Sequence, residues 1–246
     1  MAPLKGTSAS VIVDEFIWGG STSSAEVQFT TNEHDVTNLD STGMEYIPGL
    51  TTMRVVQNGY WVGPDTDGVA DELHDRLGVS GAQVAFVPIK GTTNTPVYVI
   101  PSAFNASLPI DASADAVITM NGEWAATNAG QRGKLISYNT TISGTGDGSS
   151  IDLGSAGSAG GYFYLHVHSI DGDASGTSSS SAIKVQSSSD DSTFADEGTV
   201  TFSATGGFSA TMSGTVNRYL RISTSDMGGA TSIVVTAYVV VTNVTM

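Results

Sequence analysis

Short runs rich in β-branched and aromatic residues recur along the whole chain, and Gly, Pro or Asn ends most of them. In the second half these runs follow one another every ~8–15 residues with turn residues between them, a spacing typical of β-sandwiches. One segment differs, because Val69, Leu73 and Leu77 recur every four residues and predict a helix over 67–77. The sequence therefore predicts a mainly β protein with one short helix, in which a first sandwich or barrel precedes a second β-sandwich.

The segment 143–150 reads Ser-Gly-Thr-Gly-Asp-Gly-Ser-Ser and has neither helical nor strand periodicity. Stretches of this composition are typical of linkers. We therefore expect a first domain over 1–143, a linker over 144–147 and a second domain over 148–246. The length of 246 residues agrees with two domains, since one domain usually has about 100–200 residues.

The composition offers little for chemistry. The chain has no Cys, four His and 13% charged residues, whereas average soluble domains carry about 25%. Its net charge of −15 argues against a nucleic-acid-binding protein, which needs clustered Lys and Arg to neutralise phosphates. A chain without Cys has no disulfide and no thiolate metal site. We therefore expect a structural assembly protein and not an enzyme, with no catalytic residue, no cofactor and no metal.

Two further patterns concern membranes. Polar residues follow Met1-Ala2-Pro3-Leu4-Lys5, where a secretory signal peptide would have an apolar core. The longest apolar run, 232–241, is interrupted by Thr236 and is too short to span a bilayer. We therefore expect no cleaved signal peptide and no membrane partner.

Several features of the first half follow one another in a particular order. They are a strand–loop–strand over 27–37, the segment 44–50, the helix, a hairpin over 83–101, and a Leu-Pro-Ile-Asp stretch at 108–111 before a strand. This order resembles the tail tube (major tail) protein of long-tailed bacteriophages (siphoviruses) over roughly residues 10–140. The remainder is similar to the immunoglobulin-like and carbohydrate-binding-like β-sandwich modules that are appended to phage virion proteins.

The resemblance implies a function. Six subunits would form a ring whose inner strands join into one β-barrel, and rings would stack into a tube through extended loops. An acidic lumen would let viral DNA pass to the host cell without specific binding, and the second domain would decorate the tube. The implied partners are further copies of the chain, the tape measure, tail tip and tail terminator proteins, and host surface glycans on the second domain. The implied location is the virion tail, after synthesis in the host cytoplasm.

Two sets of residues are candidates for this work. The first is a segment whose polar-then-apolar character and Pro-Gly pair suit a loop that is mobile alone and ordered on assembly. It comprises Met44, Glu45, Tyr46, Ile47, Pro48, Gly49 and Leu50. An ordinary turn between two strands is the alternative interpretation of this segment. The second set consists of candidate lumen acids near predicted strand ends, namely Glu33, Asp35, Glu45 and Asp115.

One short motif could hold a metal. His166-Val167-His168 places two imidazoles on one face of a strand, because residues i and i+2 point the same way. Two such ligands make half of a zinc site. No third His or Cys lies nearby in sequence, although Asp171 and Asp173 could add oxygen ligands. We expect these histidines to be ordinary strand residues.

Other functions remain open. A capsid decoration protein or another virion structural protein would share this composition, and it would trimerise or dock on a shell. A secreted sugar-binding module could use Trp18, Trp61 and Trp124 to line a groove, although tryptophans in β-rich domains more often lie in the core or in interfaces. Polysaccharide cleavage by paired carboxylates is the least favoured hypothesis.

Overall fold

The computed structural model describes residues 6–19, 22–38, 42–61, 69–157, 160–172 and 180–242. Strands dominate these residues, and the helical elements among them are the short turn η1 (Gly6–Ser8) and the α-helix α1 (Val69–Asp75). The prediction of a mainly β protein with one short helix is therefore confirmed. None of the described residues belongs to an apolar helix of membrane-spanning length.

The strands of the first half are β1 (Ser10–Val13), β2 (Phe16–Ile17), β3 (Thr22–Asp35), β4 (Tyr46–Tyr60), β5 (Ala82–Val87), β6 (Pro96–Ser107), β7 (Ile110–Asp111), β8 (Thr119–Ala126) and β9 (Gln131–Ile142). Those that follow are β10 (Gly146–Asp147), β11 (Ile151–Asp152), β12 (Gly161–Asp171), β13 (Ser181–Ser188), β14 (Ala195–Phe202), β15 (Gly206–Met212), β16 (Tyr219–Asp226) and β17 (Ser232–Val241). The expected strand over 10–18 is interrupted after β1, where Asp14 has a φ of 46° and begins a turn.

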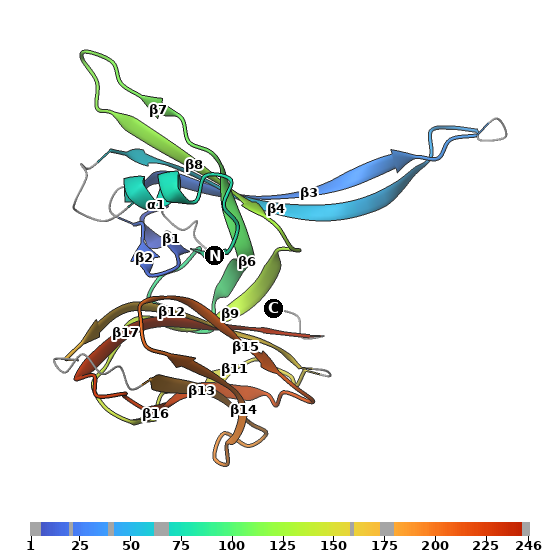
Figure 1. Ribbon diagram of the computed structural model, residues 1–246. Coiled ribbons are helices and arrows are strands. Elements are labelled where there is room, and N and C mark those ends of the chain that lie inside the picture. The colour runs from blue at the N-terminus through green and yellow to red at the C-terminus, as the bar shows by residue number, and fades with distance from the viewer. Residues whose placement is uncertain are drawn as a thin grey trace.

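One large sheet runs through both halves of the chain, in the order β15-β12-β17-β9-β6-β5-β1-β2. Strand β9 makes this continuity. Residues 131–134 pair with β6 of the first half, and residues 134–142 pair with β17 of the second half. In Figure 1 the two halves lie one above the other, with β9 passing between them.

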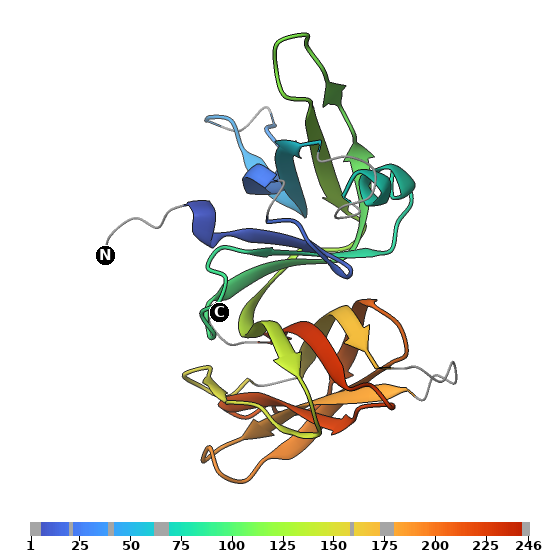
Figure 2. The same ribbon diagram turned by 90° about the vertical axis from the view of Figure 1, so that its left-hand side faces the viewer.

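A second sheet covers the C-terminal part of the large one. Its order is β10-β16-β13-β14, and β11 also pairs with β16. The two sheets enclose a core that includes Phe163, Leu165, Ile183 and Leu220. This is the β-sandwich that the strand spacing predicts, and Figure 2 shows it below the first half. Ile136 of β9 is part of this core as well, so the sandwich uses a strand that precedes residue 143.

The segment predicted as a linker, 144–147, contains β10, which pairs with β16. The chain therefore passes from one half to the other through paired strands rather than through a free connection.

A separate apolar cluster lies between the two halves. It joins Ile12, Val87 and Val97 of the first half to Tyr164 and Tyr238 of the second, and Leu135 of β9 completes it. These side chains are at most 2% exposed. The first half also has its own core, in which the rings of Trp18 and Trp124 lie 5.6 Å apart. Both tryptophans are therefore core residues and do not line a sugar groove.

Helix α1 packs onto the first half through Leu73 of its predicted stripe. Leu73 is buried against Gly122, where an added Cβ would overlap the Leu73 side chain. Leu77 is 47% exposed, because α1 ends at Asp75. Gly78, with a φ of 71°, reverses the chain after the helix as expected.

The cluster between the halves should control the stability of the whole chain. Leu135→Ala removes a fully buried side chain there and should lower the free energy of unfolding by about 2–5 kcal/mol. Thermal unfolding followed by circular dichroism should show one transition, shifted down by about 5–15 °C. The matched control is Leu50→Ala, because Leu50 is 80% exposed. Two separate transitions, with only one of them shifted, would contradict this prediction.

Candidate functional site

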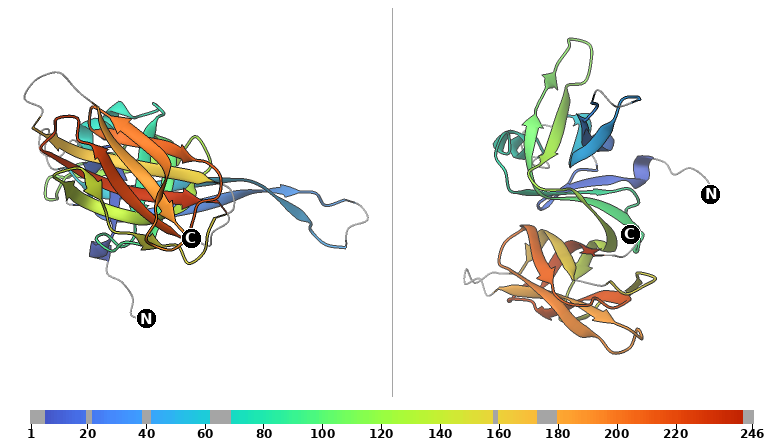
Figure 3. Two further views of the ribbon diagram at one scale, coloured as in Figure 1. Left: turned by 90° about the horizontal axis from the view of Figure 1, so that it is seen from below. Right: turned by 90° about the vertical axis from the view of Figure 1, so that its right-hand side faces the viewer.

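A long hairpin, formed by β3 and β4, projects from the first half and is called the arm below. The two strands pair from Thr22 opposite Gly59 to Asp35 opposite Tyr46. Fourteen residues of β3 extend over about 46 Å at ~3.3 Å per residue. Within β4, only residues 54–60 pair with β8. Among the described residues, the outer part of the arm therefore consists of β3 and β4 alone. Figures 1 and 3 show it leaving the body of the molecule.

The outer arm exposes large apolar side chains. Met44 is 78% exposed, Leu50 80%, Tyr46 52%, Ile47 51% and Phe29 50%. An isolated two-stranded hairpin is marginally stable in water, and clustered exposed apolar side chains are typical of interaction surfaces. The arm therefore has the character of a surface that another protein covers.

The candidate assembly segment lies in this outer arm. Residues 46–50 form the first part of β4 rather than a loop, so the expectation of a loop is wrong for these residues. Pro48 is tolerated because β4 has only β3 as its neighbour there. An added Cβ at Gly49 would lie 2.6 Å from Nε2 of His34, so the exposed His34 side chain would have to move aside. The assembly role of the segment stays a prediction.

Three of the four candidate lumen acids lie together at the outer end of the arm. Glu33 and Asp35 are in β3, and Glu45 precedes β4. Thr37 orders this end, because its amide and hydroxyl hydrogen-bond to Asp35 and lower the pKa of that carboxyl. The Thr37 hydroxyl also accepts a 2.9 Å hydrogen bond from the Glu45 amide.

The fourth candidate acid lies elsewhere. Asp115 is in the connection between β7 and β8, which forms a second projection with exposed Ile110, Val117 and Ile118. Figure 1 shows this projection and the arm pointing in different directions. The four acids therefore do not form one cluster within a single chain.

The two histidines of the His-x-His motif connect the halves of the chain. The Nδ1 atoms of His166 and His168 each lie 2.6 Å from a main-chain carbonyl, those of Asp14 and Glu15 respectively. Nε2 of His166 lies 2.7 Å from the Tyr238 hydroxyl, and Nε2 of His168 lies 2.9 Å from the Thr236 hydroxyl. All four ring nitrogens are thus engaged by the protein, which leaves none to bind a metal.

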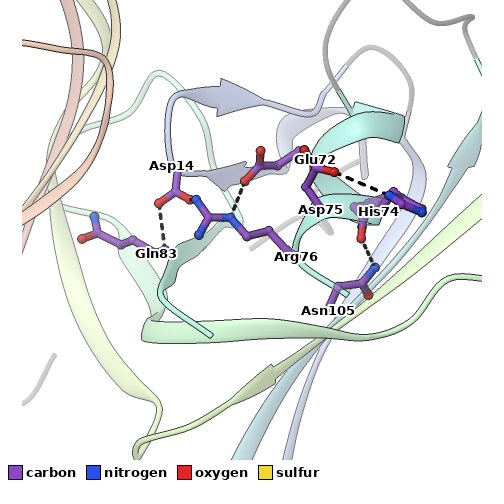
Figure 4. A network of polar contacts seen from close by, with 8 residues as sticks. Asp14, Glu72, His74, Asp75, Arg76, Gln83 and Asn105 are labelled. Atoms are coloured by element: carbon purple, nitrogen blue, oxygen red, sulfur yellow. Dashed lines mark hydrogen bonds and ion pairs between the residues drawn. The ribbon is translucent and has the colours of Figure 1, made fainter. Parts of the chain in front are cut away.

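The same turn anchors helix α1. The Asp14 carboxylate accepts a 2.9 Å hydrogen bond from the Gln83 amide and forms a 2.9 Å ion pair with Arg76. Arg76 also pairs with Glu72 at 2.7 Å, and the Asn105 side chain donates to the Leu73 carbonyl. Figure 4 shows Arg76 between the carboxylates of Asp14 and Glu72, with Asn105 beside the helix. The Gln83 side chain lies 3.2 Å from both His166 and Tyr238, so the network extends into the second half.

Burial sets the protonation of this network. Burial lowers the pKa of His166 to about 3 and lowers the pKa of His168 as well. A carbonyl oxygen can only accept, so each Nδ1 carries the proton and each Nε2 accepts from a neighbouring hydroxyl. Both imidazoles are therefore neutral at pH 7, and a second proton would put a charge in a buried apolar setting.

Sequence reasoning missed Asp14, Gln83 and Tyr238 as parts of one network. They belong to distant strands, and no local pattern connects them. Phe29 was also missed, although Phe29 lies among polar residues in a run of alternating character, which indicates a strand with at least one exposed apolar position. Its ring lies 5.7 Å from that of Tyr98.

Comparison with known proteins gives structural likeness only. No family model and no curated protein matches the chain. A chain of the virion of a native gene transfer agent particle is 16% identical, with 52% of this chain and 97% of that chain covered and a TM-score of 0.42. The SPP1 tail tube is 11% identical over 53% of this chain and 78% of that chain, with a TM-score of 0.41.

A third structure, the SPP1 Dit protein, is 7% identical. The match covers 93% of this chain and 98% of the Dit chain, with a TM-score of 0.31. At TM-scores below 0.5, none of these likenesses carries a function over to this chain.

The buried histidines should make the chain sensitive to acid. The unfolded chain binds a proton at each His below about pH 6.5, whereas folded His166, with its pKa of about 3, does not. The unfolded state thus binds more protons in this range, so stability is full above pH 6.5 and falls as the pH falls. From about pH 8 to about pH 5, His166 alone should cost about 2 kcal/mol of unfolding free energy, and His168 acts in the same direction.

Urea unfolding at the two pH values measures this loss. Asp152, with its pKa lowered to about 2, loses its stabilisation only at more acid pH. His166→Gln should flatten the pH dependence, whereas His74→Gln, at an exposed position, should leave it unchanged. A pH dependence that persists in full without His166 would contradict the assignment.

Proposed function

We propose that this chain is a structural subunit of a phage-type tail tube, in which copies form rings and the arms join successive rings. The observation that carries the proposal is the arm, a two-stranded ribbon with exposed apolar side chains and no covering layer in the single chain. The sequence resemblance to tail tube proteins supports the same function. Such a subunit acts by self-contact and needs no catalytic group.

The unpaired edge of β3 supports ring formation. Among the described strands, β3 pairs only with β4, so no other described strand pairs with the second edge of its fourteen residues. Free edges of this length invite pairing with another chain. In a closed ring, each copy would satisfy the edge of its neighbour, and the resemblance implies six copies per ring.

The direction of the arm supports stacking. The arm leaves one side of the molecule, so its end must contact a different surface on the next copy. A contact between two different surfaces is heterologous, and it generates either a closed ring or an open filament. A ring formed through strand edges together with arms that join rings would give a tube.

The charge supports passage of DNA through that tube. A net charge of −15 repels phosphates and limits non-specific binding. We propose that Glu33, Asp35, Glu45 and Asp115, from different copies, contribute to an acidic channel, except where one of the three arm carboxylates pairs with a cation in the contact between copies. The tape measure, tail tip and tail terminator proteins are the further partners that this function requires.

The second half would form the outside of the tube. Because β9 and the cluster between the halves hold the two parts together, this β-sandwich would be carried as a fixed body rather than as a tethered appendage. We propose a decorating role for it, with host surface glycans as its candidate ligand.

The apolar outer arm provides the test. Ile47→Asp combined with Leu50→Asp adds two charges to an exposed ribbon, so the single chain should fold normally while assembly is lost. Sedimentation velocity should show large species for the parent protein and only monomer for the double variant at the same concentration. The control adds the same two charges to exposed positions of β14, through Thr199→Asp and Thr201→Asp, and should assemble like the parent.

Two outcomes would contradict the proposal. In one, the arm variant assembles as well as the parent does. In the other, the β14 variant loses assembly and the arm variant keeps it, which would move the contact to the second half.

A further inference from the structure

A cleft of about 290 Å³ lies at the base of the arm. Its walls come from β1, from the turn after β2, from the first residues of β3 and from Lys90, which follows β5. The lining residues are Gly6, Ala9, Ser10, Val11, Trp18, Gly19, Thr22, Ser23, Ser24, Ala25 and Lys90. None of them is acidic, although the chain has 24 acidic residues.

Two buried hydrogen-bond donors without a partner belong to residues that line the cleft. The Ser10 hydroxyl and the Trp18 indole N–H belong to residues that are 4% and 1% exposed, and neither has a partner within the described part of the chain. An added Cβ at Gly19 would lie 3.8 Å from Ser10 Oγ and 4.0 Å from Lys90 Nζ, so both groups border the same turn. A buried polar group without a partner is costly, and the Lys90 ammonium suits a carboxylate.

Lys90 is also unusual among the basic residues. Arg54, Arg76, Lys184, Arg218 and Arg221 each form an ion pair, and Lys134 donates to the Asn94 carbonyl. Among the Lys and Arg residues that the structure describes, only Lys90 and Arg132, both exposed, have side chains with neither an ion pair nor a hydrogen bond. The chain has a net charge of −15. A free ammonium at a cleft without acidic residues therefore attracts an acidic segment.

We infer that this cleft receives the acidic outer end of the arm from a second copy of the chain. That end carries Glu33, Asp35 and Glu45 beside exposed Met44 and Leu50, so it offers carboxylates together with apolar contact. Lys90 would pair with one of the carboxylates.

The same arm cannot fill its own cleft. The cleft is lined by residues 22–25, at the start of β3, and Glu33 lies about 26–36 Å further along the strand at ~3.3 Å per residue. Each copy therefore has one acidic arm end and one basic cleft, separated by the length of the arm. Repetition of this contact gives a head-to-tail series, and it specifies the receiving surface for the arm contact in the proposed function, on which this inference rests.

Charge reversal tests the pairing. Lys90→Glu should raise the concentration needed for assembly by about tenfold or more, because it replaces an attraction with a repulsion at a partly desolvated contact. Arg132→Glu, which reverses the other unpaired cation outside the cleft, should leave assembly unchanged. Combining Lys90→Glu with Glu33→Lys and Glu45→Lys swaps the charges across every contact and should restore assembly. Sedimentation velocity at low salt measures all four proteins.

Cross-linking tests the contact directly. A carbodiimide joins an amine to a carboxylate in contact without adding a spacer. Assembled mixtures of ¹⁴N- and ¹⁵N-labelled protein should give links between Lys90 and Glu33, Asp35 or Glu45 that contain one peptide of each label. Links from Lys90 only to other acids, or no links from Lys90 in assembled protein, would overturn the inference.

The outcomes separate this inference from the proposed function. If the arm variant fails to assemble while Lys90→Glu behaves like Arg132→Glu, the arm contact stands and the cleft is not its receiver. If the unchanged protein remains monomeric at every concentration, both proposals are wrong.

Discussion

Strand β9 hydrogen-bonds to β6 through its first residues and to β17 through the rest, and the arrangement of the whole chain depends on this change of partner. The change occurs near Gly133, where an added Cβ would overlap the Val239 carbonyl, so the two strands can approach only because this residue has no side chain. Leu135 and Tyr238, packed beside it, bury the space between the halves. Two modules that look separate in sequence thus form one body.

The direction of the arm is defined only if the body that carries it is held together. Here one buried network through Asp14, Gln83 and His166 connects the β1–β2 turn, helix α1 and the C-terminal sheet. The polar atoms of the network are paired, while the donors at the base of the arm are not. Satisfied groups hold the subunit together, and in the proposed assembly the cleft and the arm are the parts that contact other copies.

Local patterns predict the strands of this chain but not their pairing. Alternation places His166 and His168 on one face of a strand, and their rings are indeed parallel, 6.4 Å apart. Their partners, the carbonyls of Asp14 and Glu15, lie more than 150 residues away, and no local pattern predicts such contacts. Pro48 and Gly49 favour a loop by propensity, yet they lie in strand β4. Pro48 is tolerated there because β4 has a single neighbour. Likewise, the composition of 144–147 indicates a linker, although these residues include strand β10.

Electron microscopy of the purified protein over a concentration series tests the central claim most directly, namely that this chain is a unit of an open, head-to-tail assembly. The account predicts hollow tubes or stacked rings, with a central channel and the C-terminal sandwiches as knobs on the outside. A stable closed trimer, or single particles at every concentration, would contradict it. A trimer would instead favour a decoration protein of a viral shell.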